Sequence, residues 1–240
     1  MSEAAAPTLS LVHVVREPVP GAPLASLGAT GGRREAKPPL LLLLHGVGSH
    51  EGSMARLAPA FDPRFLVVSA RSPIALGPGA FGFFHVTFTA AGPVIDRDEA
   101  AAGWAHVARF VDEAAATYGA DPARVYVAGF SQGGIMALAA LLTAPERIAG
   151  AVCMSGRLLP EVLPHAASAE ALRGKPVLIV HGTDDEKLGV HLARSARETL
   201  GRFPLDVTYR ELDMGHRVTE ESLGVVSEWL TARLDGQPTG

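Results

Sequence analysis

Five consecutive leucines, Leu40–Leu44, constrain the fold more than any other stretch of this 240-residue chain. They lie between a Pro-Pro pair and a His-Gly pair, and a run of this length is too short to form a stable helix alone. An uninterrupted apolar run is typical of a strand that is buried on both faces. Because such a strand needs helices above and below it, the run predicts a layered α/β arrangement.

Apolar runs alternate with amphipathic stretches along the rest of the chain. Further strands are predicted at Leu9–Arg16, Phe65–Ala70, Arg124–Gly129, Ile148–Met154, Pro176–Val180 and Asp206–Leu212. Helices are predicted at Met54–Ala60, Asp98–Tyr118, Ser131–Leu142, Val190–Leu200 and Thr219–Leu234. We therefore predict one α/β domain over residues 1–240, with a mostly parallel central sheet and helices on both faces. The Gly- and Pro-rich segment 18–39 is expected to form a flexible loop.

The composition favours a globular protein and argues against a nucleic-acid-binding or membrane protein. Hydrophobic residues make up 48% of the chain and charged residues 19%, which is typical of a globular fold. The formal net charge of −4 and the absence of a Lys/Arg-rich run argue against a nucleic-acid partner. A single cysteine, Cys153, excludes an internal disulfide. No stretch resembles a signal peptide or a membrane span, so we expect a cytoplasmic protein with no membrane partner.

The segment Gly129-Phe130-Ser131-Gln132-Gly133 fits the pattern G-x-S-x-G between a predicted strand and a predicted helix. At such a sharp turn, a Cβ at the flanking positions would collide with the neighbouring strand and helix, and glycine avoids this collision. The turn would expose the Ser131 hydroxyl beside a helix N-terminus. A neutral serine is a poor nucleophile, so the interpretation requires a nearby base.

The chain offers a base and an acid in the required order. Asp184 and Asp185 directly follow the next-to-last predicted strand, and His216 follows the last one. Of the nine histidines, two come after both aspartates, and His191 lies in a predicted amphipathic helix. We therefore predict His216 as the base, and either aspartate as the acid. The order Ser, acid, His is that of α/β-hydrolase sheets.

An oxyanion hole is predicted beside the leucine strand. His45-Gly46-Val47-Gly48 follows this strand directly, and its small residues let backbone N–H groups approach a substrate oxygen. We assign the two donors to the backbone N–H groups of Val47 and Gln132. Because their side chains are not needed for this role, substitutions at both positions are expected to be tolerated.

Several ordered blocks carry a family resemblance: LLLLHGVGSHE, ARSPIALGPGAFGFFHV, GFSQGG, GAVCMSGRLLP, VLIVHGTDDEKLGV and MGHRV. Together they resemble the phospholipase/carboxylesterase family of α/β-hydrolases, which includes bacterial carboxylesterases and acyl-protein thioesterases. The family pattern H-G-x-x-D implies that Asp185 is the triad acid and that Asp184 is a solvated neighbour. The resemblance also makes Phe81, Phe83 and Phe84 candidates for the wall of the acyl pocket, and ordinary core packing is the alternative for each.

These observations predict a serine hydrolase (EC 3.1.1.-) that cleaves small carboxylic esters and needs no metal or organic cofactor. Short acyl chains are favoured because the extended loop Ser72–Gly92 is too modest for a large lid. The alternative is an acyl-protein thioesterase or lysophospholipase that acts on longer chains. A non-catalytic binding protein is a remote alternative, because no nucleophile, base or elbow glycine is missing. The resemblance further suggests a homodimer.

Overall fold

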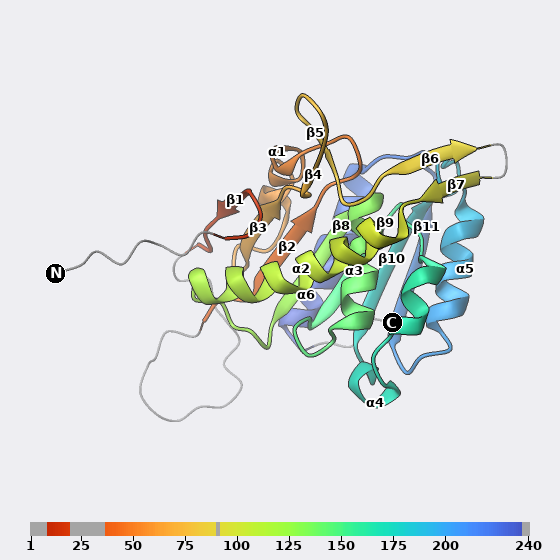
Figure 1. Ribbon diagram of the computed structural model, residues 1–240. Coiled ribbons are helices and arrows are strands. Elements are labelled where there is room, and N and C mark those ends of the chain that lie inside the picture. The colour runs from red at the N-terminus through yellow and green to blue at the C-terminus, as the bar shows by residue number, and fades with distance from the viewer. Residues whose placement is uncertain (1–8, 20–36, 90–91, 237–240) are drawn as a thin grey trace, which may run out of the picture.

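A computed structural model describes residues 9–19, 37–89 and 92–236 (Figure 1). Its central sheet contains β1 (His13–Arg16), β2 (Leu40–Leu44), β3 (Leu66–Ala70), β8 (Val125–Phe130), β9 (Gly150–Met154), β10 (Pro176–Gly182) and β11 (Asp206–Leu212). The seven strands run in the order β1-β3-β2-β8-β9-β10-β11. β1 pairs with β3 in antiparallel orientation, and every other neighbouring pair is parallel. The predicted mostly parallel sheet is therefore confirmed.

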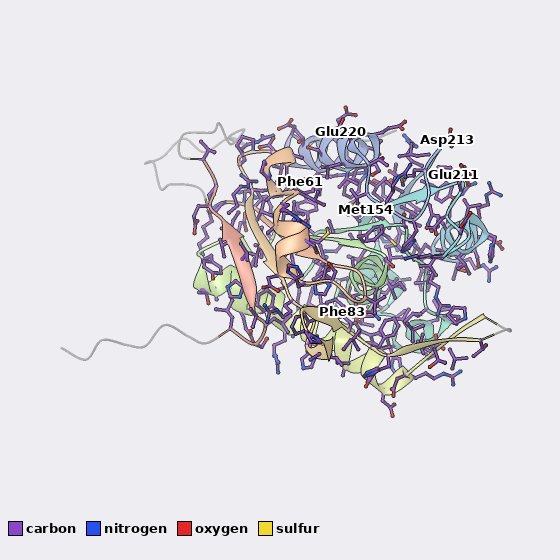
Figure 2. The ribbon with its side chains drawn as sticks, turned by 90° about the horizontal axis from the view of Figure 1, so that it is seen from above. Phe61, Phe83, Met154, Glu211, Asp213 and Glu220 are labelled. Carbon is purple, nitrogen blue, oxygen red and sulfur yellow. The ribbon has the colours of Figure 1, made fainter. Side chains whose placement is uncertain are left out.

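Helices cover both faces of this sheet. One face carries α1 (Glu51–Ala55), the short 3-10 helix η1 (Ala58–Ala60) and α6 (Glu220–Leu234). The other face carries α2 (Arg97–Thr117), α3 (Gln132–Thr143), the 3-10 helix η2 (Pro160–His165), α4 (Ala169–Leu172) and α5 (Val190–Leu200). Figure 2 shows the two layers, with Phe61 on the α6 side and Phe83 on the α2 side. In the described part of the chain, no helix is both long and apolar enough to span a bilayer.

The leucine run behaves as its sequence predicts. Leu40–Leu44 forms β2, and all five side chains are fully buried between the two helical layers. Burial of an apolar side chain of this size contributes about 1.5–3 kcal/mol, so β2 is a major part of the core. The expected helix Met54–Ala60 is instead divided into α1 and η1, where Pro59 lies in the first turn of the 3-10 helix. Of the loop predicted at 18–39, residues 20–36 lie outside the described residues.

The segment that the sequence presented as one extended loop contains two hairpins. β4 (Ile74–Gly77) pairs with β5 (Ala80–Gly82), and β6 (Val86–Thr89) pairs with β7 (Gly92–Ile95). Figure 1 shows both hairpins along one edge of the molecule, at the top of the view. The alternation of apolar and polar residues in β6 is the signal of a half-buried strand. These strands are only three or four residues long and lie outside the central sheet, so the sequence shows no long apolar run for them.

Two glycines allow α3 to begin very close to the sheet. A Cβ at Gly133 would overlap the carbonyl oxygen of Leu44, and a Cβ at Gly129 would overlap the backbone of Gly133. These neighbours are backbone atoms, which cannot rotate away as a side chain can. Glycine is therefore required at both positions, and the first turn of α3 lies directly against the end of β2.

We predict that Gly133→Ala lowers the free energy of unfolding by at least about 3 kcal/mol, because the added methyl group has no space. Gly224→Ala in α6 is the matched control, since a Cβ there meets no atom within 4 Å. Alanine in this open helical position should stabilise the protein by about 0.5–1 kcal/mol. Urea unfolding of both variants measures the difference; equal stability of the two would contradict the close contact.

Candidate active site

Ser131 lies at the turn between β8 and α3 with an unusual backbone conformation. Its φ of 54° and ψ of −116° are rarely adopted by residues other than glycine. The Ser131 N–H donates to the carbonyl of Met154 over 2.8 Å, and its own carbonyl accepts from the Ile135 N–H over 3.0 Å. Contacts to both β9 and α3 therefore hold the strained turn that the G-x-S-x-G pattern predicts.

A chain of hydrogen bonds connects Ser131 to His216 and Asp185. The Nε2 atom of His216 is 3.0 Å from Ser131 Oγ, and its Nδ1 atom is 2.7 Å from Asp185 Oδ2. Because an ionised carboxylate can only accept, Nδ1 donates to Asp185, and the Nε2 lone pair of the neutral ring faces Ser131. The Phe130 ring packs on the imidazole with a centroid separation of 4.9 Å. The side chains are thus arranged for proton transfer from Ser131 to His216.

The structure distinguishes Asp185 from Asp184. Asp185 is 4% exposed, and its Oδ1 atom accepts from the backbone N–H groups of Lys187 over 3.0 Å and Leu188 over 2.8 Å. His181 closes the same loop by donating from Nε2 to the Leu188 carbonyl over 2.6 Å. Burial lowers the pKa of His181, so this ring remains neutral near pH 7. Asp184 is exposed to solvent, as the resemblance implies.

The loops after β10 and β11 meet because Gly182 has no side chain. A Cβ at Gly182 would overlap the carbonyl of Met214. The Thr183 N–H donates to the Leu212 carbonyl over 2.9 Å, and the Asp184 N–H donates to Met214 over 3.2 Å. These two backbone contacts bring the loop that carries the acid against the loop that carries His216.

Two backbone N–H groups are available beside Ser131. Val47 and Gln132 line the same cavity as Ser131 and His216. Neither of their N–H groups has a hydrogen-bond acceptor within the described residues. Gln132 is the first residue of α3, and N–H groups in the first turn of a helix have no intrahelical acceptor. A substrate oxygen at this position could accept from both groups.

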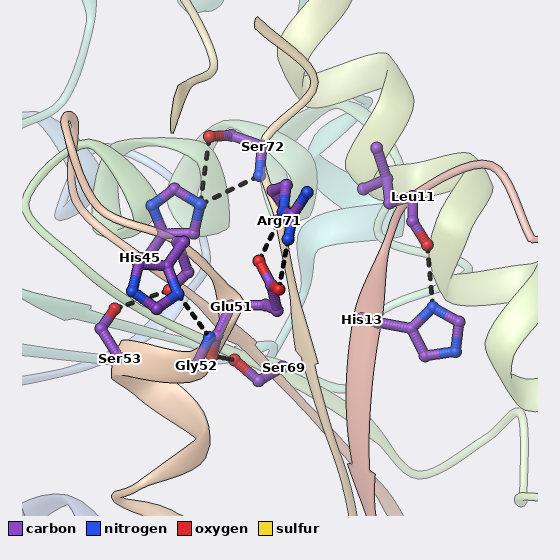
Figure 3. A network of polar contacts seen from close by, with 10 residues as sticks. Leu11, His13, His45, Glu51, Gly52, Ser53, Ser69, Arg71 and Ser72 are labelled. Carbon is purple, nitrogen blue, oxygen red and sulfur yellow. Dashed lines mark hydrogen bonds and ion pairs between the residues drawn. The ribbon is translucent and has the colours of Figure 1, made fainter. Parts of the chain in front are cut away.

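His45 fixes the orientation of the peptide that carries the Val47 N–H, and Figure 3 shows the contact of this ring with Ser72. Its Nε2 atom accepts from the Ser72 N–H over 3.0 Å, so the proton of the neutral ring is on Nδ1, which donates to the Gly46 carbonyl over 2.8 Å. In a trans peptide the carbonyl and the following N–H point in opposite directions. The contact to Gly46 therefore directs the Val47 N–H away from His45. Burial lowers the pKa of His45, which keeps the ring neutral.

An ion pair between Arg71 and Glu51 lies at the end of the loop that follows β2. The Arg71 guanidinium makes two contacts of 2.6 Å with the Glu51 carboxylate at the start of α1 (Figure 3). These hydrogen bonds lower the pKa of Glu51 to about 2, so the carboxylate stays ionised. The guanidinium also lies over the Phe81 ring, 4.4 Å from its centroid. Phe81 is therefore tied to the loop after β2 through Arg71.

The Gln132 side chain has a second role that the sequence did not indicate. It is 3% exposed; its Oε1 atom accepts from the Phe83 N–H over 2.7 Å, and its Nε2 atom donates to the Phe84 carbonyl over 2.8 Å. The amide thereby holds the segment between the two hairpins against the start of α3. These contacts argue against the expected tolerance at Gln132. For Val47, whose side chain is 39% exposed, that expectation remains a prediction.

Ser131 and His216 open onto a cavity of about 560 Å³. Its other lining residues are Gly46, Val47, Phe84, Val86, Pro93, Ile95, Phe130, Gln132, Ile135, Arg157, Glu186, Lys187 and Leu188. Of the three phenylalanines predicted near the pocket, Phe84 is in this lining. Phe83 is 1% exposed and packs in the core, and Phe81 lies under Arg71; neither belongs to the lining found among the described residues. The hairpin residues and Arg157 were not anticipated.

Metal-ligating side chains and the single thiol are two kinds of group that could form a second site within the described residues. In residues 9–19, 37–89 and 92–236, no three His, Cys, Asp or Glu side chains lie close enough to hold a metal ion. The Cys153 thiol is buried, and burial raises its pKa to about 12. The thiol therefore remains protonated at neutral pH and is a poor nucleophile.

Residues 30–234 match the sequence model of the family described as Phospholipase/Carboxylesterase. The chain belongs to this family. Carboxylesterase SOBER1 of Arabidopsis thaliana is 25% identical over 209 residues, which cover 82% of this chain and 91% of the relative. Acyl-protein thioesterase 1 of Neurospora crassa is 32% identical over 117 residues, or 46% of each chain. The crystal structure of esterase PE8 superimposes with a TM-score of 0.75 at 25% identity, covering 92% of this chain and 98% of that chain. As a member of the phospholipase/carboxylesterase family, the protein is a serine hydrolase of the carboxylesterase type.

We predict that Gln132→Met lowers kcat/KM for an ester substrate at least tenfold and destabilises the protein by about 2–4 kcal/mol. Methionine is similar in size but leaves the buried Phe83 N–H and Phe84 carbonyl without partners, at a cost of about 1–3 kcal/mol each. KM should rise more than kcat falls, because Phe84 belongs to the cavity wall while the backbone N–H is retained. The control is Val47→Ala, for which ester kinetics and urea unfolding should change little. A Gln132→Met enzyme with unchanged KM would contradict the positioning role.

Proposed function

We propose that this protein hydrolyses short-chain carboxylic esters with Ser131 as nucleophile, His216 as general base and acid, and Asp185 as the orienting carboxylate. The observation that carries the proposal is the continuous chain of hydrogen bonds from Ser131 Oγ through His216 to Asp185, beside a cavity. Membership of a serine hydrolase family supports the same chemistry. The proposed mechanism proceeds through an acyl-enzyme.

In the first half-reaction, Ser131 Oγ attacks the ester carbonyl carbon while His216 Nε2 accepts the hydroxyl proton. The resulting imidazolium is stabilised by the Asp185 carboxylate. The tetrahedral oxyanion accepts hydrogen bonds from the Val47 and Gln132 N–H groups, and loss of one such donor costs about 3–4 kcal/mol in the barrier. The bond to the alcohol oxygen then breaks, and His216 returns its proton to the departing alcohol.

In the second half-reaction, water attacks the acyl carbon that is bound to Ser131. His216 accepts a proton from this water, and a second tetrahedral oxyanion forms in the same position. When the intermediate collapses, the carboxylic acid leaves and Ser131 Oγ recovers its proton from His216. His216 is therefore the base in each half-reaction and the acid that returns each proton.

The cavity walls favour a small substrate. Its volume of about 560 Å³ is in the range of small-molecule sites. The β6–β7 hairpin contributes Val86, Pro93 and Ile95 to the cavity lining. Ile135 of α3 and Phe84 belong to the same lining. These apolar side chains suit a short acyl chain or a small alcohol group and exclude water from the ester.

Ser131→Ala should lower kcat/KM for p-nitrophenyl butyrate by at least about 10⁴-fold and abolish labelling by a fluorophosphonate. Asp185→Asn should also lower kcat/KM by about 10⁴-fold, because it no longer selects the ring tautomer of His216. Asp184→Asn is the matched control, and we expect a change of less than about threefold because this side chain is exposed. Circular dichroism establishes that each variant is folded. A folded Ser131→Ala protein with full activity would exclude the proposed nucleophile.

Chain-length preference is tested separately with acetyl, butyryl and octanoyl p-nitrophenyl esters. The proposed small substrate predicts a higher kcat/KM for acetyl and butyryl than for octanoyl, since the hairpin and α3 bound the cavity. Concentrations are kept below the point at which octanoyl esters form micelles. A marked preference for octanoyl would instead favour a thioesterase or lysophospholipase that acts on longer chains.

A further inference from the structure

Arg157 is a charged residue of the cavity that the proposed ester hydrolysis does not use. It follows β9, the strand beside β8, and lines the same cavity as Ser131 and His216. The preceding residue, Gly156, lies against the nucleophile turn: a Cβ there would be 3.0 Å from the Ser131 carbonyl oxygen and 3.3 Å from the Ile135 N atom. The backbone that carries Arg157 is therefore held directly beside the nucleophile.

The positive charge of Arg157 has no close counterion. Within the described residues, its guanidinium makes no hydrogen bond and no ion pair. The acid that acts on it electrostatically is Glu161 in η2. The carboxylate of Glu161 is itself engaged by Arg97, at 3.3 Å from Nε. The cavity contains two other charged side chains, Glu186 and Lys187, which are exposed and of opposite sign.

A partly buried guanidinium that no protein group binds is available to a ligand in the cavity. Burial lowers the pKa of Arg157, although an arginine remains protonated in proteins. Its five N–H groups form a planar fork that matches the two oxygens of a carboxylate. Val86, Ile95 and Ile135 line the same cavity, and apolar walls of this kind reduce the competition from water for such a contact. One guanidinium matches the single charge of a carboxylate.

We propose that Arg157 binds a carboxylate carried by the ester substrate, which makes the preferred substrates anionic esters such as hemiesters of dicarboxylic acids. This inference rests on the proposed ester hydrolysis and specifies the substrate class of the same site. The ester carbonyl lies at Ser131 while the carboxylate, elsewhere on the same molecule, pairs with the guanidinium. The carboxylate takes no part in bond breaking, so the two half-reactions are unchanged.

The test compares anionic esters with neutral esters of equal chain length. The p-nitrophenyl hemiesters of adipate and pimelate are paired with p-nitrophenyl hexanoate and heptanoate, which are shorter than the octanoyl chain that the proposed function disfavours. For a carboxylate on the alcohol side, 4-acetoxybenzoate is paired with 4-acetoxybenzamide. The measured quantity is the ratio of kcat/KM for the anionic ester to kcat/KM for its neutral partner.

In the wild-type enzyme, this ratio should exceed one for at least one pair. Arg157→Gln should lower that ratio by about 10- to 100-fold, as expected for the loss of a hydrogen-bonded charge pair, and mainly by raising KM for the anionic ester. Arg157→Lys should retain part of the preference, because it keeps the charge but loses the fork. The control is Arg202→Gln, which removes the same charge from an exposed position paired with Glu198, outside the cavity.

A ratio that is the same in wild type and Arg157→Gln, in an enzyme that cleaves neutral esters through Ser131, would overturn the inference and leave the proposed function standing. In that case the Arg157 guanidinium is hydrated by water and does not contact the substrate. A wild-type protein that cleaves no ester and resists the fluorophosphonate would instead refute the proposed function. Calorimetric titration of adipate into Ser131→Ala and into Ser131→Ala/Arg157→Gln then decides the inference: binding should be at least tenfold weaker in the double variant, and equal binding would overturn it.

Discussion

The close contact between the first turn of α3 and the end of β2 is the constraint on which the whole site depends. Without a side chain at Gly133, the helix begins directly against the Leu44 carbonyl, and the loop after β2 lies beside the helix N-terminus. Two N–H groups from distant parts of the sequence can then face one position next to Ser131. The strained conformation of Ser131, which costs on the order of 1–3 kcal/mol, is maintained because the buried strands β8 and β9 hold the turn.

The sequence predicted those parts of the molecule that depend on local pattern. Apolar runs such as Leu40–Leu44 must be buried whatever surrounds them, and the order of Ser131, Asp185 and His216 follows from parallel strands that end at one edge. The hairpins were missed because their strands are short and pair with one another outside the main sheet. The sequence also left open which phenylalanines line the cavity: Phe83 enters the core while Phe84 borders the cavity, a difference that tertiary packing decides.

The polar groups of the site act at two distances from the ester. In the proposed reaction, Ser131 and His216 meet the reacting atoms, whereas buried groups behind them determine their orientation. The Gln132 side chain joins α3 to the cavity wall, and His181 closes the loop that holds Asp185. Each of these contacts satisfies a buried backbone group, which is why a polar side chain is present in an otherwise apolar environment. Arg157 differs from them, because no protein group satisfies it among the residues described.

The hydrogen bonds of His45 have a consequence for behaviour in acid. A protonated ring would present an N–H to the Ser72 N–H, so two donors would oppose each other and the contact would be lost. The Nδ1–H contact to the Gly46 carbonyl would persist, while the other side of the ring would be held only through the Ser72 hydroxyl oxygen, 3.1 Å from Nε2. Since burial lowers the pKa of His45, protonation of its Nε2 atom requires a lower pH than protonation of an ordinary histidine. Acid would accordingly loosen the packing of the ring that lies behind one oxyanion donor, without breaking the contact that orients the donor.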